Sequence, residues 1–293
     1  MTPAEIDTML KELEADCLEE KPRDLKKLGI DEITQLKGGK NYAAVLVDLE
    51  KRKPIALLEK RNKEVIAEYL QGLGSAILNQ IEEVSIDEVN AALGACIREN
   101  VDLWKPYKTV VEELIPNAQV VADRFHVMTQ INKELDDRRK KEKRQAEKLT
   151  NKKEKEPKLE GIKHSKYPLL KKRENLNETE KEKLKEIEKV APELIAAYLA
   201  KEKLRDIFES QITSDEAFWK LVEWTESSYK YFPKTSQTIK RWSDEILAYF
   251  DNRTTQGAVE GINQKIKLIK RRAYGLTNFG NFRRRILLNW HFC

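Results

Sequence analysis

Residues 28–60 read LGIDEITQLKGGKNYAAVLVDLEKRKPIALLEK, and this stretch decides the fold. Its first part predicts a short strand around Asp31, and the pair Gly38-Gly39 predicts a turn. The run NYAAVLVDLE is almost continuously apolar, as in strands that are buried on both faces. The letters KRK predict a turn, and PIALLEK predicts a third strand that runs back along the second. The stretch therefore predicts a meander of three strands.

Helices and two more strands are expected beyond the meander. A helix begins near Asn62, and IEEVSID predicts a fourth strand that ends on Asp87. Residues 88–99 have helical spacing, and DLWKPYKTVVEELI predicts another helix with Asp102 in the N-cap position. NAQVVADRFHV predicts a fifth strand that ends at Asp123.

From Met128 to about Tyr249 the pattern predicts helices and no strand. The charged run DDRRKKEKRQAEKLTNKKEKEPKLE is interpreted as a solvated helical arm or mobile linker, with direct nucleic-acid contact as the alternative. NETEKEKLKEIEKVAPELIAAYL predicts one helix, capped near its start by Asn177 or Thr179. A stripe of aromatic residues is expected to form core: Phe218, Trp219, Trp224, Tyr229, Tyr231 and Phe232.

The composition allows a real core and gives no sign of a membrane protein. The chain has 293 residues, of which 40% are hydrophobic and 36% charged. No apolar run approaches the roughly 18 residues of a membrane span, and the acidic N-terminus lacks signal-peptide features. Cys17, Cys96 and Cys293 fit neither a disulfide framework nor a zinc pattern. We therefore expect a soluble, cytoplasmic protein with no membrane partner.

The charge of the chain is uneven although the net charge is only +5. Residues 258–285 carry eight Lys or Arg and a single acid, Glu260, which favours a polyanion partner. A helix here would have one apolar stripe, formed by Val259, Ile262, Ile266 and Ile269. The neighbouring polar stripe begins with the acid and continues into cations: Glu260, Gln264, Lys267 and Arg271.

A lone acid on the first turn of a helix has two interpretations. It favours the helix dipole by about 0.3–1 kcal/mol, or it joins acids at strand ends to bind Mg²⁺, which prefers oxygen ligands. In a sheet of order 3-2-1-4-5, Asp31 and Asp87 face each other, whereas Asp48 and Asp123 are interpreted as turn or capping residues. Glu32 adjoins Asp31 and points to the opposite face of the sheet.

Four motifs resemble the DDE transposases of bacterial insertion sequences, of the ISL-three group: GIDE, YAAVLVDLE, DLWKPYKTVVEELIPNAQVVADRFHV and YFDNRTTQGAVEGINQKIKLIKRRAYGLTNF. The resemblance covers about residues 28–288. It implies an α/β, RNase H-like fold, in which a mixed sheet of order 3-2-1-4-5 is flanked by helices and interrupted by a large all-helical insertion. It also implies cleavage and transfer of DNA strands by two divalent ions, Mg²⁺ or Mn²⁺.

The expected partners and domains follow from the same resemblance. The partners are double-stranded DNA, as transposon ends and target, and a second copy in a homodimer, so the protein would be nucleoid-associated. An N-terminal helix remnant, 1–27, precedes the first part of the catalytic core, 28–130, which includes an unusual extra segment, 88–102. The helical insertion is 131–245, and 246–293 completes the core with the catalytic helix.

The motifs carry over a catalytic, metal-binding triad of Asp31, an aspartate after strand four, and Glu260. The family pattern resembles an unbroken VSIDLWKPY, which the segment 88–102 divides here, so that Asp87 and Asp102 each keep half. We favour Asp87 because it keeps the strand-end position, and Asp102 is the alternative. Phosphate contacts, salt-sensitive and largely independent of sequence, are expected from Lys265, Lys267, Lys270, Arg271, Arg272 and Arg124.

Two other functions stay open at this point. Family members usually carry a cysteine-rich zinc module and a helix-turn-helix before the core, and here only about 27 residues precede the first strand. One alternative is therefore a truncated, catalytically impaired remnant that only binds DNA. The other is a helical interaction protein in which residues 131–245 are the working part.

Overall fold

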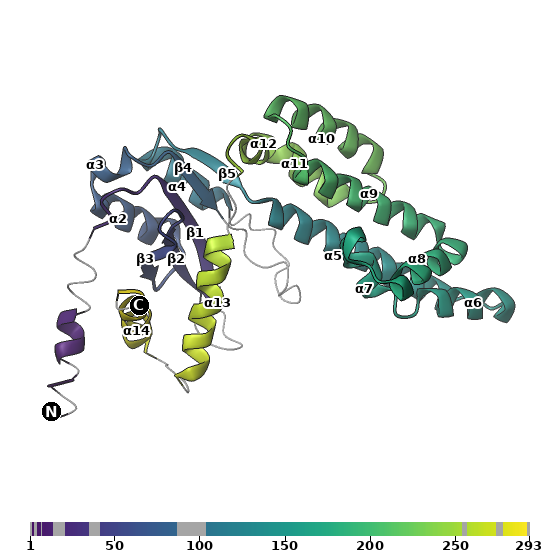
Figure 1. The fold of residues 1–293 in the computed structure, drawn as a ribbon, viewed down its shortest axis with the longest axis horizontal. Coiled ribbons are helices and arrows are strands. Elements are labelled where there is room, and N and C mark those ends of the chain that lie inside the picture. The colour runs from purple at the N-terminus through teal and green to yellow at the C-terminus, as the bar shows by residue number, and fades with distance from the viewer. Residues whose placement is uncertain are drawn as a thin grey trace. The chain divides into compact units, whose positions relative to one another are not determined.

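The computed structural model describes residues 2, 5–6, 8–13, 21–34, 42–86, 104–253, 257–273 and 278–291. The chain forms two compact units, which we call the sheet unit (1–123 with 254–293) and the helical unit (124–253). Figure 1 shows the elements of both. The helical unit includes residues 131–245, for which the sequence predicts a helical insertion.

The sheet has five strands in the order β3-β2-β1-β4-β5, which confirms the predicted order and all five predicted strands. β1 pairs antiparallel with β2 and parallel with β4, while β2–β3 is antiparallel and β4–β5 is parallel. The mixed sheet and its flanking helices form the expected α/β, RNase H-like fold. The strands are β1 Lys27–Thr34, β2 Tyr42–Asp48, β3 Lys53–Leu58, β4 Glu83–Ile86 and β5 Gln119–Ala122.

Asp48 is a turn residue, as predicted. Its buried Oδ1 accepts the backbone N–H groups of Glu50 (3.1 Å) and Lys51 (2.9 Å), which closes the β2–β3 hairpin. Pro54 sits on the edge strand β3, where the pairing with β2 shifts register between Leu46 and Val47. An edge strand tolerates proline because it needs no backbone donor on its outer side.

Two groups of helices bury the two faces of the sheet, as Figure 1 shows. One face carries Leu28, Ile30 and Leu46 and is covered by α2 (Lys63–Leu73), α3 (Ser75–Leu78) and α4 (Trp104–Leu114). The other face carries Val45 and Val47 and is covered by α13 (Gly257–Arg272) and α14 (Phe279–His291). Alternate residues of β1 therefore point to different helices. The apolar stripe predicted for 259–269 is buried against this second face.

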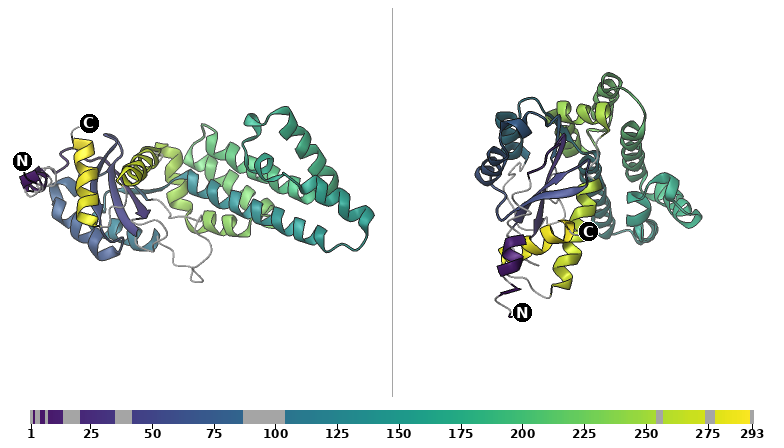
Figure 2. Two further views of the ribbon diagram at one scale, coloured as in Figure 1. Left: turned by 90° about the horizontal axis from the view of Figure 1, so that it is seen from below. Right: turned by 60° about the vertical axis from the view of Figure 1, so that its left-hand side comes forward.

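The helical unit contains no strand among residues 124–253, as predicted. The charged run forms α5 and α6, which confirms a helical arm, and Figure 2 shows α5 beside its neighbouring helices. No helix in the described ranges is long and apolar enough to cross a bilayer. The elements are α5 Arg124–Glu147, α6 Lys152–Ile162, α7 Lys166–Leu170, η2 Arg173–Asn175, α8 Glu178–Val190, α9 Pro192–Glu209, α10 Ser214–Ser228, α11 Pro233–Arg241 and α12 Ser243–Asn252.

The prediction of one helix beginning near Asn177 was wrong, because α8 and α9 are separate helices that meet at Ala191. Pro192 has no N–H to continue α8, and its fixed φ suits the first position of α9. The capping prediction holds for Asn177, whose side chain accepts the N–H of Glu180 at 2.8 Å. Glu180 accepts the N–H of Asn177 in return at 2.9 Å, so the pair forms a capping box.

The prediction that the aromatic stripe forms core was right only in part. Trp224 and Phe232 are buried and stacked 6.1 Å apart, and the Trp224 indole donates to the Ala200 carbonyl. Trp219, in contrast, is 70% exposed, and Phe218 is exposed beside it. α10 turns only one face inward, and residues 218 and 219 lie off that face.

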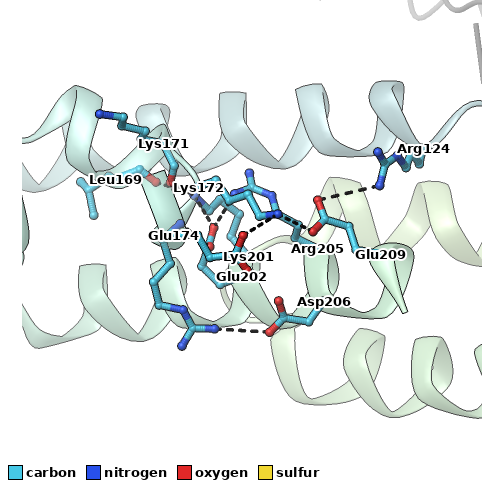
Figure 3. Close-up of polar contacts among 11 residues, drawn as sticks. Arg124, Leu169, Lys171, Lys172, Glu174, Lys201, Glu202, Arg205, Asp206 and Glu209 are labelled. Carbon is cyan, nitrogen blue, oxygen red and sulfur yellow. Dashed lines mark hydrogen bonds and ion pairs between the residues drawn. The ribbon is translucent and has the colours of Figure 1, made fainter. Parts of the chain in front are cut away.

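A fully buried ion pair fixes the segment before α8 to α9, and Figure 3 shows its contacts. Lys201 Nζ donates to the carbonyls of Leu169 (2.8 Å) and Lys171 (3.2 Å) and pairs with Glu202 at 2.8 Å. Glu202 also accepts the backbone N–H of Arg173 at 2.9 Å. Burial lowers the pKa of Lys201 to about 8, and the carbonyls and Glu202 compensate its charge.

Lys201→Met should destabilise the helical unit by about 1–3 kcal/mol, because the carbonyls of Leu169 and Lys171 lose their buried donor. Glu202 loses one of its two cations and keeps Arg205 at 3.0 Å. The control is Lys203→Met, which removes an exposed pair with Glu223 worth about 0–1 kcal/mol. Urea denaturation of the full chain, followed by tryptophan fluorescence, measures both. Equal small losses in the two variants would contradict the structural role of Lys201.

Both ends of the helical unit are attached to the C-terminal end of α9. Arg124, the first residue of α5, pairs with Glu209 at 3.8 Å (Figure 3). Arg253, just after α12, donates to the carbonyls of Phe208 (3.1 Å), Ser210 (2.7 Å) and Ile212 (3.0 Å). The helical unit thus begins and ends at one place, although its two ends are far apart in sequence.

Candidate active site

Asp31 lies within β1 on the face covered by α13, and it is 5% exposed. Its Oδ1 accepts the backbone N–H of Glu32 at 2.6 Å. Its Oδ2 accepts the side-chain N–H of Asn263, which belongs to α13. Both oxygens of this buried carboxylate are therefore oriented by neighbours, one on its own strand and one on the helix.

Gly29 allows α13 to lie close to β1. A Cβ at this position would come within 2.8 Å of side-chain atoms of Val259 and Leu49, closer than ordinary contacts allow. Further along the same strand, Lys270 Nζ donates to the Thr34 carbonyl at 2.7 Å. α13 therefore follows β1 along its length, and the glycine of GIDE determines how near the helix comes to Asp31.

Gly29→Ala should destabilise the sheet unit by about 1–3 kcal/mol, since the new methyl group overpacks the contact with Val259. The matched control is Gly72→Ala in α2, where a Cβ meets nothing within 4 Å and should stabilise by about 0.5–1 kcal/mol. Thermal unfolding of the full chain measures both. Stabilisation by Gly29→Ala would show that α13 does not need this close approach.

Glu260 occupies the first turn of α13, with its side chain exposed. Partial loss of solvent around the side chain, together with the nearby charges of Asp123 and Asp31, raises its pKa, and Lys267 opposes the shift. Asp123 is buried between the end of β5 and the start of α5, and its role as a turn or capping residue stays a prediction. Its position after a strand was the sequence signal that could have placed it near Glu260, because parallel neighbours such as β4 and β5 end at the same edge of the sheet. Two buried carboxylates, Asp31 and Asp123, thus act on Glu260.

Glu260→Gln should raise the melting temperature of the metal-free protein at pH 7. A pKa raised by folding means that ionised Glu260 lowers the stability of the folded state. This destabilisation is absent at pH values below the ordinary pKa of 4.5, and it grows as the pH rises through the raised pKa. The melting temperatures of Glu260→Gln and the wild-type chain should therefore differ at pH 7 and converge at acidic pH. Differential scanning calorimetry in EDTA measures both.

The control for that prediction is Glu64→Gln. Glu64 lies in the first turn of α2, where its charge favours the helix dipole, so its loss should lower the melting temperature or leave it unchanged. A lowered melting temperature for Glu260→Gln as well would mean that the dipole outweighs the neighbouring acids at Glu260.

Glu32 points to the opposite face of the sheet, as predicted. Tyr107 donates its hydroxyl to Glu32 Oε1 at 2.6 Å, and the Arg61 guanidinium pairs with Oε2. Burial raises the pKa of Glu32, while both partners oppose the shift. The adjacent acids of β1 therefore lie back to back, and only Asp31 faces α13.

Both candidates for the middle acid, Asp87 and Asp102, lie outside the described residues, as does the segment between them. The described pairing of β1 with β4 ends at Ile30 and Ile86. These residues directly precede Asp31 and Asp87 in the sequence.

The predicted phosphate-binding cations divide into two groups. Lys265 lies over the Trp290 ring at 4.2 Å, Lys270 is held by β1, and Arg124 pairs with Glu209. These three have contacts within the chain. The other three are exposed on the last turns of α13: Lys267, Arg271 and Arg272.

The chemistry of the site suits a hard cation. Among the described residues, no three histidine, cysteine or carboxylate side chains converge closely enough to enclose a metal ion. The carboxylates of Asp31, Glu260 and Asp123 supply oxygen atoms in this region, and the buried Asn263 Oδ1 accepts no hydrogen bond. Oxygen donors of this kind are what Mg²⁺ and Mn²⁺ prefer.

A family model described as "Transposase", of the ISL-three DDE group, matches residues 28–286. The chain is 28% identical over 274 residues to the transposase for insertion sequence element IS1557 of Mycobacterium tuberculosis, covering 87% of this chain and 58% of that protein. It is 27% identical over 258 residues to the transposase for insertion sequence element IS1001 of Bordetella parapertussis, covering 86% and 57%. The chain thus spans somewhat more than half the length of these curated relatives.

Proposed function

Because the chain belongs to the ISL-three family of DDE transposases, we propose that it cleaves and joins DNA strands with two divalent cations, Mg²⁺ or Mn²⁺. The observation that carries this proposal is the contact of α13 with β1, which brings Glu260 into the electrostatic range of Asp31 and Asp123. The substrate would be double-stranded DNA, as transposon ends and target. A pair of copies would act on the two ends.

Asp31, Glu260 and the middle aspartate would hold the cations. When bound, two such ions activate the attacking oxygen and stabilise the leaving oxygen of a phosphodiester. Asp31 suits a bridging position because it is buried and oriented through both oxygens. Glu260 suits an outer position because its side chain reaches solvent. Asp87 is favoured over Asp102, since the β1–β4 pairing leads directly to Asp31 and Asp87.

The exposed cations of α13 would bind the DNA backbone. Lys267 and Arg271 share the polar stripe that begins with Glu260, and Arg272 follows them. Contacts with phosphates position a strand without reading its sequence. These cations would therefore hold a DNA strand so that its scissile phosphate lies near Glu260.

The test is Mn²⁺-dependent nicking and strand transfer with the full chain and supercoiled DNA. Asp31→Asn and Glu260→Gln should each reduce the rate by more than about a hundred-fold, because loss of outer partners of a metal site alone costs about 10–100-fold. Glu64→Gln, an exposed first-turn acid on α2, should leave the rate unchanged. Asp87→Asn and Asp102→Asn, made separately, identify the middle acid. Full activity in Glu260→Gln would refute the proposal.

A second candidate is a DNA-binding remnant that no longer cleaves. The division of the middle-aspartate motif by residues 88–102 favours it. Such a protein would bind DNA with wild-type affinity after Glu260→Gln and would bind no Mn²⁺ at this site. Mn²⁺ titration followed by electron paramagnetic resonance separates the two candidates.

A further inference from the structure

Asn263 is a polar residue in an otherwise apolar contact. It is 6% exposed and lies between Ile262 and Ile266 of the stripe that packs on the sheet. Its side-chain nitrogen donates to Asp31 Oδ2, but its side-chain oxygen is buried and accepts no hydrogen bond. A buried oxygen without a donor costs about 1–3 kcal/mol. Such a group calls for a functional explanation.

The position of Asn263 provides that explanation. It follows Glu260 by three residues, so the two side chains are neighbours on the surface of α13. Asn263 is buried against β1 at Asp31, while the Glu260 side chain reaches solvent. The amide thus lies beside the two carboxylates proposed to hold the cations.

We propose that the side-chain oxygen of Asn263 is a further ligand of the divalent cation held by Asp31 and Glu260. The inference rests on the proposed function. A neutral amide oxygen completes the shell of a hard cation without adding another negative charge beside Asp31, Asp123 and Glu260. In the metal-free protein the amide N–H occupies Asp31 Oδ2. With a cation bound at Asp31, this N–H would no longer be needed there, and the Asn263 amide would be able to present its oxygen to the ion.

The first experiment measures Mn²⁺ affinity of the metal-stripped full chain by electron paramagnetic resonance. Asn263→Leu, which keeps the branching and the number of side-chain heavy atoms and removes the oxygen, should raise the Kd about ten-fold or more. Gln264→Leu is the matched control, since it removes an exposed amide at the next position and should leave the Kd unchanged. An unchanged Kd in Asn263→Leu would overturn the inference.

The second experiment separates ligation from mere orientation of Asp31. A thiolate prefers soft cations, so Asn263→Cys should shift the preference for Cd²⁺ over Mn²⁺ by about ten-fold or more if residue 263 contacts the ion. Gln264→Cys corrects for an added thiol elsewhere on α13. Weaker Mn²⁺ binding without this shift would make Asn263 a positioning residue for Asp31 and overturn its assignment as a ligand.

The results also separate this inference from the proposed function. A wild-type chain that binds Mn²⁺ no better than Glu260→Gln would overturn both. A wild-type chain that binds Mn²⁺ while Asn263→Leu binds equally well would overturn only the role of Asn263. If Asn263→Leu shows no cooperative unfolding in EDTA, the comparison of Asn263→Cys with Gln264→Cys decides.

Discussion

The contact between α13 and β1 is the interaction on which the rest of the site depends. Gly29 permits the close approach, the apolar stripe of α13 buries itself on the sheet, and Asn263 reaches Asp31 across 232 positions of sequence. Two of the proposed ligands, Glu260 and Asn263, are carried by this one helix. A change in its distance from β1 would therefore move Glu260 and Asn263 together.

This contact holds like charges near one another. Asp31 and Asp123 are buried, and with the burial of its surroundings they raise the pKa of Glu260. Such an arrangement destabilises the metal-free fold, and a divalent cation bound there would neutralise the acids. The apolar packing of α13 therefore holds these carboxylates together against their repulsion, and relief of that repulsion would contribute to the cation affinity of the proposed site.

Local patterns predicted much of this arrangement. The alternation in β1 placed Asp31 and Glu32 on opposite faces, and the helical period of 259–269 identified the buried stripe. Where prediction failed, the missing information was tertiary. The exposure of Trp219 depends on which face of α10 packs inward, and the proximity of Asp123 to Glu260 depends on strand pairing. The break at Pro192 was visible in the sequence and was outweighed by the surrounding helical spacing.

The central claim is that Asp31 and Glu260 hold a common divalent cation, and anomalous diffraction from crystals soaked in Mn²⁺ tests it most directly. The account predicts an anomalous peak between the two carboxylates, within about 2.2 Å of an oxygen of each. A well-ordered α13 with Glu260 directed away from Asp31, and no peak between them at saturating Mn²⁺, would contradict it.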